Sequence, residues 1–120
     1  MKKLYSAVTG IDQGSVALFS DFEDNGEMWA GQGDRERWIP VEFSEAFRDV
    51  PSVMVTLELL DMHNGTNHRA VTVAENITET GFDIVFRTWG DTRVARARAA
   101  WLAIGAVNAD DDWDIDSADS

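Results

Sequence analysis

The feature that most constrains this chain is an alternation of apolar and polar residues with a period of two, which recurs at 52–61, 69–77 and 82–89. The residues it places on the inward face are Val53, Val55, Leu57 and Leu59 in the first segment, Val71, Val73 and Ile77 in the second, and Phe82, Ile84 and Phe86 in the third. This period is typical of β-strands with one face in a core. We therefore predict three consecutive half-buried strands joined by polar turns.

A fourth strand is predicted at 94–104, although this alanine-rich run is also compatible with a helix. We favour a strand because the preceding segment 90–92 has the length of a hairpin turn and Gly105 closes the run. Two further strands are predicted upstream, at 15–19 and 35–43. The fold class that accommodates all of them is all-β, a six-stranded antiparallel β-sandwich.

The chain length of 120 residues fits one compact core, which we assign to residues 1–107. The remaining segment, 108–120, holds six aspartates and little that could be buried, so it is predicted to be an acidic, disordered tail. Its alternating aspartates resemble the start of a calcium-binding loop. The central glycine and the final glutamate of such loops are missing, and a solvated tail is the favoured interpretation.

The net charge of −12 argues against two classes of partner. It repels phosphate backbones and anionic membrane surfaces, so neither nucleic acid nor membrane insertion is expected. No apolar run approaches the roughly 20 residues of a membrane helix, and the N-terminus lacks the apolar stretch of a signal peptide. These features predict a cytoplasmic protein, or one that is released by a non-classical route.

Residues that could carry chemistry are present but lack the spacing that such chemistry needs. The candidates for metal binding or proton transfer are Asp61, His63, His68 and Asp91. No H-x-x-x-H or H-x-H spacing occurs among them, and the chain has no cysteine. A pair of carboxylates suited to a glycosidase is expected by chance among 22 acidic residues. We therefore predict no catalytic residues, no metal, no cofactor and no enzymatic activity.

The segment 87–92 favours a binding site instead. It puts Trp89 at a strand end beside Gly90 and Asp91. Sugars present an apolar face and a rim of hydroxyls, so an indole with charged hydrogen-bond donors beside it suits them. Arg69 is a candidate donor, because pairing of the two strands brings it to the same edge as Trp89. The alternative, that Trp89 lies in the core and Arg69 is a surface charge, is equally compatible with the pattern.

Several short motifs follow one another in a distinctive order between residues 41 and 105. They are Val41-Glu42-Phe43, Pro51-Ser52-Val53, Leu60-Asp61, Arg69, Ala74-Glu75-Asn76-Ile77-Thr78, Gly81-Phe82, Thr88-Trp89-x-Asp91-Thr92 and Trp101-Leu102-Ala103-Ile104-Gly105. Each is weak alone, but their order and spacing resemble those of the H-type lectin domain. Similar features at Gly10, Ile11, Gly14 and Trp29 extend the resemblance over most of the chain.

This resemblance implies a six-stranded sandwich that forms a homotrimer and binds galactose-type sugars, often N-acetylgalactosamine, in clefts between protomers. It implies sugar contacts from an arginine at the start of the fourth strand and a tryptophan at the end of the fifth, which match Arg69 and Trp89. A third contact is an acidic residue in the loop before the second strand. We take Asp34 for this role, with Gln32 as the alternative, and include Gly90 and Asp91 in the predicted ligand-binding set.

Two positions depart from the snail members of that family. These often have histidine directly after the tryptophan and an aromatic residue six positions after it, where this chain has Gly90 and Ala95. Two contacts are therefore missing, which alters affinity or sugar choice. An alternative function is a structural or adhesion module that trimerises but has a decayed sugar site.

Self-association is also expected from the second faces of the predicted strands, which are more apolar than solvent-facing surfaces usually are. The residues on these faces are Met54, Val85, Ala95, Ala97 and Ala99. An exposed apolar patch of this kind usually marks an interface, and a closed trimer, or a multiple of three, would bury it.

Overall fold

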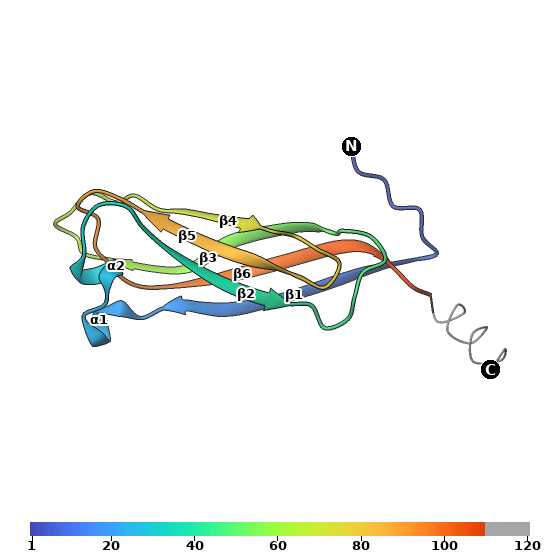
Figure 1. Ribbon diagram of the computed structural model, residues 1–120, viewed down its shortest axis with the longest axis horizontal. Coiled ribbons are helices and arrows are strands. Elements are labelled where there is room, and N and C mark those ends of the chain that lie inside the picture. The colour runs from blue at the N-terminus through green and yellow to red at the C-terminus, as the bar shows by residue number, and fades with distance from the viewer. Residues whose placement is uncertain (110–120) are drawn as a thin grey trace.

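Two antiparallel sheets pack face to face in the computed structural model, which describes residues 1–109 (Figure 1). One sheet has the strand order β1-β6-β3 and the other β2-β5-β4. The strands are β1 (Val8–Phe19), β2 (Arg35–Glu42), β3 (Ser52–Met62), β4 (Val71–Glu75), β5 (Gly81–Thr88) and β6 (Val94–Val107). The predicted all-β architecture is thereby confirmed. The predicted acidic tail lies outside the described residues from position 110 onward.

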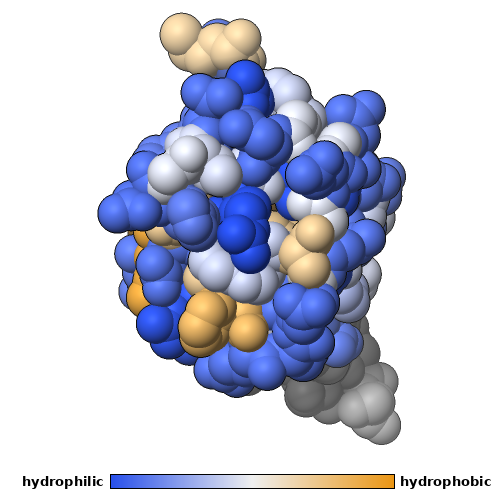
Figure 2. All heavy atoms as spheres, turned by 90° about the vertical axis from the view of Figure 1, so that its left-hand side faces the viewer, coloured by the Kyte–Doolittle hydropathy of each residue, from blue (hydrophilic) through white to orange (hydrophobic). Residues whose placement is uncertain are grey.

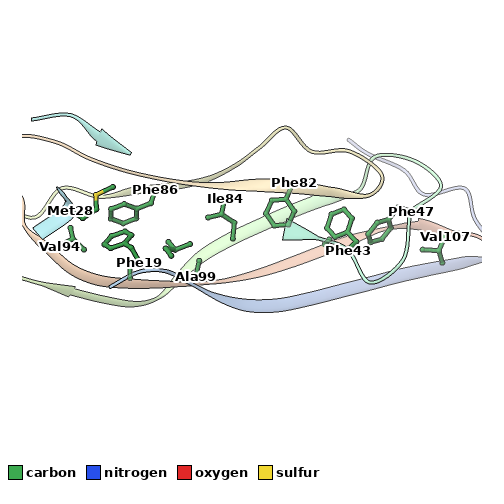
Figure 3. Packing of buried hydrophobic residues seen from close by; sticks show 13 residues of the cluster. Phe19, Met28, Phe43, Phe47, Phe82, Ile84, Phe86, Val94, Ala99 and Val107 are labelled. Atoms are coloured by element: carbon green, nitrogen blue, oxygen red, sulfur yellow. The ribbon is translucent and has the colours of Figure 1, made fainter. Parts of the chain in front are cut away.

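The core lies between the sheets, and Figure 3 shows its buried side chains extending along the length of the sandwich. Phe82, Ile84 and Phe86 of β5 point into it and are 4%, 0% and 0% exposed. This part of the predicted inward set is confirmed. Ala99 and Ala103 of β6 are fully buried in the facing sheet. Because alanine is small, β6 leaves room for the phenylalanine rings between the sheets.

Strand β3 departs from the predicted alternation at its centre. Its pairing with β6 shifts between Leu57 and Leu59, and such a bulge interrupts the alternation of faces. Leu57 packs against the core as predicted, whereas Leu59 is 44% exposed. The prediction that Leu59 faces inward is therefore wrong, because an extra residue in one strand is set by pairing and is invisible in the hydrophobic pattern.

Strand β4 buries the face opposite to the predicted one. Val71, which was expected inside, is 40% exposed and pairs with the outward-facing Arg87 of β5. Paired residues share a face, so Val73, two positions further on, faces outward as well. Ile77 packs on the core as predicted, because the left-handed backbone of Asn76, with φ of 53°, reverses the alternation.

The alanine-rich segment forms strand β6, as predicted, but its alanines do not line an exposed face. Ala95, Ala97 and Ala99 are 6%, 2% and 0% exposed, and Val85 is 0% exposed. The expectation that these four residues belong to an exposed interface is wrong, because Ala97 and Ala99 pack in the core between the sheets and neighbouring side chains cover Ala95 and Val85. Met54 does face outward and is 65% exposed.

The segment before β2 contains structure that the hydrophobic pattern missed. Strand β1 begins at Val8 rather than near 15. The hydrophobic pattern missed its first half because glycines interrupt the alternation there. One of them, Gly14, lies against Trp101, since a Cβ on it would be 2.8 Å from Nε1 of the indole. Two helical turns follow, α1 (Asp21–Asp24) and α2 (Glu27–Ala30). The buried carboxylate of Asp21 accepts hydrogen bonds from the backbone N–H of Met28 and from Nη2 of Arg37, both at 3.0 Å. These contacts fix the loop that leads into β2.

Neither of these turns, nor any other helix within residues 1–109, has the length and apolar character needed to cross a membrane.

Candidate functional site

A pocket of about 560 Å³ opens on the outer face of the β2-β5-β4 sheet, where β5 ends. Its lining residues are Asp34, Arg35, Glu36, Val71, Arg87, Thr88 and Trp89. Figure 2 views the end of the molecule that carries α1, α2 and the neighbouring loops, and there hydrophilic residues surround a few apolar patches. The residues that line the pocket therefore combine one large aromatic surface, the indole of Trp89, with charged side chains.

The strand register explains why these residues meet. Arg87 of β5 pairs with Glu36 of β2 on one side and with Val71 of β4 on the other. Trp89 follows Arg87 by two positions, so it points to the same outer face. Asp34 and Arg69 precede Glu36 and Val71 by two positions, which brings all three predicted residues to the same end of the sheet.

Trp89 lies outside the core, and 41% of it is exposed. The preceding residue, Thr88, points inward instead and is 1% exposed. Its Oγ1 donates a hydrogen bond of 2.6 Å to the carbonyl oxygen of Arg69. This hydrogen bond holds the backbone of Arg69 next to Trp89. Of the two interpretations that the sequence left open for Trp89, a position in the core is excluded.

Arg69, Gly90 and Asp91 form a cluster beside the pocket. Nη1 of Arg69 lies 2.8 Å from Oδ1 of Asp91. Asn67 also donates to the Asp91 carboxylate, and this hydrogen bond, followed by that of Arg69, holds the pKa of Asp91 below its usual value. Gly90 has φ of 69°, and a Cβ there would lie 2.9 Å from Nη1 of Arg69. A glycine at this position lets the guanidinium lie against the turn.

Arg35 holds the loop before β2 against the turn after β5. It is 7% exposed, and its guanidinium donates to the carbonyl oxygens of Glu27, Met28, Gly33 and Gly90 at 2.9 to 3.3 Å. The backbone N–H of Gly33 adds a hydrogen bond of 2.9 Å to Gly90. Burial lowers the pKa of Arg35 from its usual value, which leaves an arginine protonated near neutral pH. This clamp positions Asp34 at the rim of the pocket.

The structure thus divides the predicted site residues into two adjoining groups. Asp34 and Trp89 line the pocket, whereas Arg69, Gly90 and Asp91 form the neighbouring cluster. Sequence reasoning missed the pocket residues Arg35, Glu36, Val71, Arg87 and Thr88. The opposite charges of Glu36 and Arg87 at outward positions of two strands were the available signal, but they point to a site only when the register is known.

The residues weighed for metal binding have other partners. Asp61 pairs with Arg96, with 3.0 Å between Oδ2 and Nε. Nδ1 of His63 accepts a hydrogen bond from the N–H of Gly65, and Nε2 of His68 lies 3.1 Å from the carbonyl oxygen of His63. Within residues 1–109, no group of three or more histidines and carboxylates has the arrangement of a metal site.

Comparison with known proteins relates this chain to a family of sugar-binding domains. The family model of the H-type lectin domain matches residues 38–104, which include Arg69, Trp89, Gly90 and Asp91 but not Asp34. A protein of Fuscovulum blasticum named ATP synthase subunits region ORF 7 is 56% identical over 110 residues, covering 92% of this chain and 96% of that protein. Its name gives a gene region and states no activity.

Discoidins are similar over part of their length. One of the discoidin-1 polypeptides of Dictyostelium discoideum is 37% identical over 81 residues, which cover 67% of this chain and 32% of the discoidin. The solved structure of recombinant discoidin II from the same organism matches with a TM-score of 0.72 and 27% identity, over 86% of this chain and 39% of that one. The chain therefore spans less than half the length of the discoidins that it matches.

Proposed function

The chain belongs to the H-type lectin domain family, and from this premise we propose that it binds carbohydrate without transforming it. The sugars we propose are of the galactose type, galactose or N-acetylgalactosamine. Trp89 carries the proposal. Its large aromatic surface is 41% exposed at the edge of a pocket that also holds carboxylates and a guanidinium. An indole that stacks on the apolar face of a sugar, beside groups that bond to its hydroxyls, is a suitable receptor.

In the proposed complex each of the five residues has a separate role. The indole of Trp89 contacts the apolar face of the sugar, and Arg69 donates hydrogen bonds to its hydroxyls. Asp34 accepts hydrogen bonds from hydroxyls at the opposite rim. Gly90 leaves the space in which Arg69 lies, and Asp91 holds the guanidinium in place through the 2.8 Å ion pair. Because charge-assisted hydrogen bonds are directional, this set favours one arrangement of hydroxyls over another.

We further propose that the sites lie in clefts between the protomers of a homotrimer. Support for self-association comes from the outer face of the β1-β6-β3 sheet. The exposed apolar residues there are Ile11, Met54, Leu102 and Ile104, which are 64%, 65%, 36% and 37% exposed. Strand pairing makes these residues contiguous, since Met54 pairs with Leu102 and Ile11 with Ile104. A contiguous apolar patch of this kind usually marks a contact with another chain.

Calorimetric titration of galactose and N-acetylgalactosamine, with glucose and mannose as controls, tests the sugar-binding proposal. Trp89→Ala should weaken binding by about 1 to 3 kcal/mol through loss of stacking, and Arg69→Ala by a comparable amount. The matched control is Phe22→Ala, because Phe22 is 59% exposed at the same end of the sandwich but does not line the pocket. Unchanged affinity in both site variants would refute the proposed site. Absence of sugar binding by the unmodified protein would refute the proposed function.

A further inference from the structure

A second half-exposed indole lies on the same sheet face as Trp89. Trp38 of β2 is 42% exposed and pairs with Val85 of β5. Trp89 lies four positions after Val85, so strand alternation directs both indoles to the outer face. At roughly 3.3 Å per residue, the backbone positions of the two tryptophans are about 13 Å apart along the strand direction. One sugar ring cannot contact both indoles, whereas a short chain of linked rings can.

The surface between the two indoles is part of the pocket already described. Glu36 and Arg87 both line that pocket, and both contact Trp38. Oε1 of Glu36 accepts a hydrogen bond of 2.9 Å from Nε1 of Trp38, and its Oε2 accepts one of 3.1 Å from Nε of Arg87. Cζ of Arg87 lies 5.8 Å from the centroid of the Trp38 ring. Trp38 is therefore held in place at the far end of a polar surface that begins at Trp89.

We propose that Trp38 forms a distal subsite, so that the ligand of this face is a neutral oligosaccharide whose terminal ring contacts Trp89 and whose later rings reach Trp38. This inference rests on the proposed sugar-binding function. It makes Trp38 a specificity residue for chain length, and it makes Glu36 and Arg87 the polar contacts for the rings between the two indoles.

The charges of the surface favour a neutral ligand. Glu36 and Arg87 are paired with each other, and Glu75 lies 3.9 Å from the same guanidinium. Hydrogen bonds from Trp38 and Arg87 hold the pKa of Glu36 below its usual value, so it remains a carboxylate near neutral pH. With Asp34 at the rim, three carboxylates lie in or beside the pocket, against the two arginines that line it. An anionic polysaccharide would meet repulsion here, and the net charge of −12 adds to it.

The test compares ligands of increasing length. Galactose and neutral galactose-terminated oligosaccharides of two, three and four rings, in several linkages, are titrated into the unmodified protein and into Trp38→Leu. Leucine keeps an apolar cover over the fully buried Val85 but removes the indole. The matched control is Phe22→Leu, which removes an exposed aromatic ring from outside the pocket. Thermal unfolding and sedimentation are measured for every variant.

We expect affinity to rise at least about fivefold from galactose to the best longer ligand. Trp38→Leu should lose that rise while it binds galactose within about twofold of the unmodified protein. Phe22→Leu should retain both properties. An acidic oligosaccharide of the same length should bind more weakly than the neutral one.

Each contrary outcome identifies what fails. If the unmodified protein binds galactose but shows no gain with length, or if Trp38→Leu keeps the gain, the distal subsite is refuted and the proposed function stands. If the unmodified protein binds none of the ligands, both are refuted. If Trp38→Leu lowers the sedimenting mass, Trp38 belongs to a contact with a second copy of the chain, and the subsite is likewise refuted.

Discussion

Gly90 shows how one residue determines which side chains can lie around the proposed sugar site. Its φ of 69° lies in the left-handed region, and a Cβ there would lie 2.9 Å from Nη1 of Arg69. A side chain at this position, such as the histidine that snail members often carry, requires Arg69 to move. The absence of histidine and the position of Arg69 are therefore linked.

Replacing Gly90 should distinguish the effect of backbone strain from the effect of a steric clash with Arg69. In Gly90→Ala the left-handed backbone is unfavourable by roughly 1 to 2 kcal/mol, and the methyl group also displaces the Arg69 guanidinium. We expect both a lower melting temperature and weaker sugar binding. Gly33→Ala is the matched control, because Gly33 has φ of 78° but no atom within 4 Å of the added Cβ. Equal loss of sugar affinity in the two variants would show that the contact with Arg69 is irrelevant.

Some of the site could be predicted from the sequence and some could not. Trp89 and Arg69 are visible because each lies at the end of a recognisable strand, and strand pairing makes their positions calculable. Glu36 and Arg87 are ordinary surface charges until the register sets them side by side. Arg35 was missed for another reason: its partners are backbone carbonyls, which leave no trace in residue identity.

At the scale of secondary structure, the Arg35 clamp joins two neighbouring parts of the chain to a third that is distant in the sequence. It links α2, the loop before β2 and the turn after β5. Arg35→Ala would remove the guanidinium donor from four carbonyl oxygens and leave the space of a buried side chain unfilled. We expect destabilisation of about 2 kcal/mol or more, measured by urea unfolding. The control is Arg48→Ala, because Arg48 is an exposed arginine and should change stability by less than about 0.5 kcal/mol. Similar losses in both variants would contradict the clamp.

Prediction of the strands succeeded where one face of a strand is consistently apolar, and it failed where neighbouring strands decide. Phe82, Ile84 and Phe86 of β5 are spaced two positions apart, and the structure buries all three of them as expected. In β4 both faces carry small or branched residues, so the pattern cannot choose between them. Pairing with Arg87 then turns Val71 outward. The bulge at Leu59 and the helical turns at 21–30 depend on tertiary contacts, such as those of Asp21, for the same reason.

At the scale of the whole molecule, the proposed trimer depends on the apolar outer face of the β1-β6-β3 sheet. Met54 lies on the edge strand β3, is 65% exposed and pairs with Leu102 of the central strand β6. Met54→Glu puts a charge where a second protomer would exclude water, so the sedimenting species should shift from trimer toward monomer. Val50→Glu, at a loop residue that is 41% exposed, adds the same charge elsewhere and should leave the trimer intact. A monomeric unmodified protein at micromolar concentration would contradict the trimer itself.

The acidic segment at the C-terminus provides a test of long-range charge effects on assembly. Residues 110–120 contain six aspartates, so a chain that ends at Ala109 has a net charge of −6 instead of −12. The predicted tail began at 108, but Ala109 is 9% exposed, and truncation should therefore spare it. Because the deleted segment has one tryptophan and little else that is apolar, we expect the melting temperature to stay within about 3 °C.

Like charges on three protomers repel, so the truncated chain should assemble at lower protein concentration in low salt. This difference should vanish in high salt, where charges are screened beyond about 3 Å. Sedimentation of both chains at the two salt concentrations measures it. A larger fall in melting temperature, or a difference in assembly that persists in high salt, would show that the segment packs against the domain.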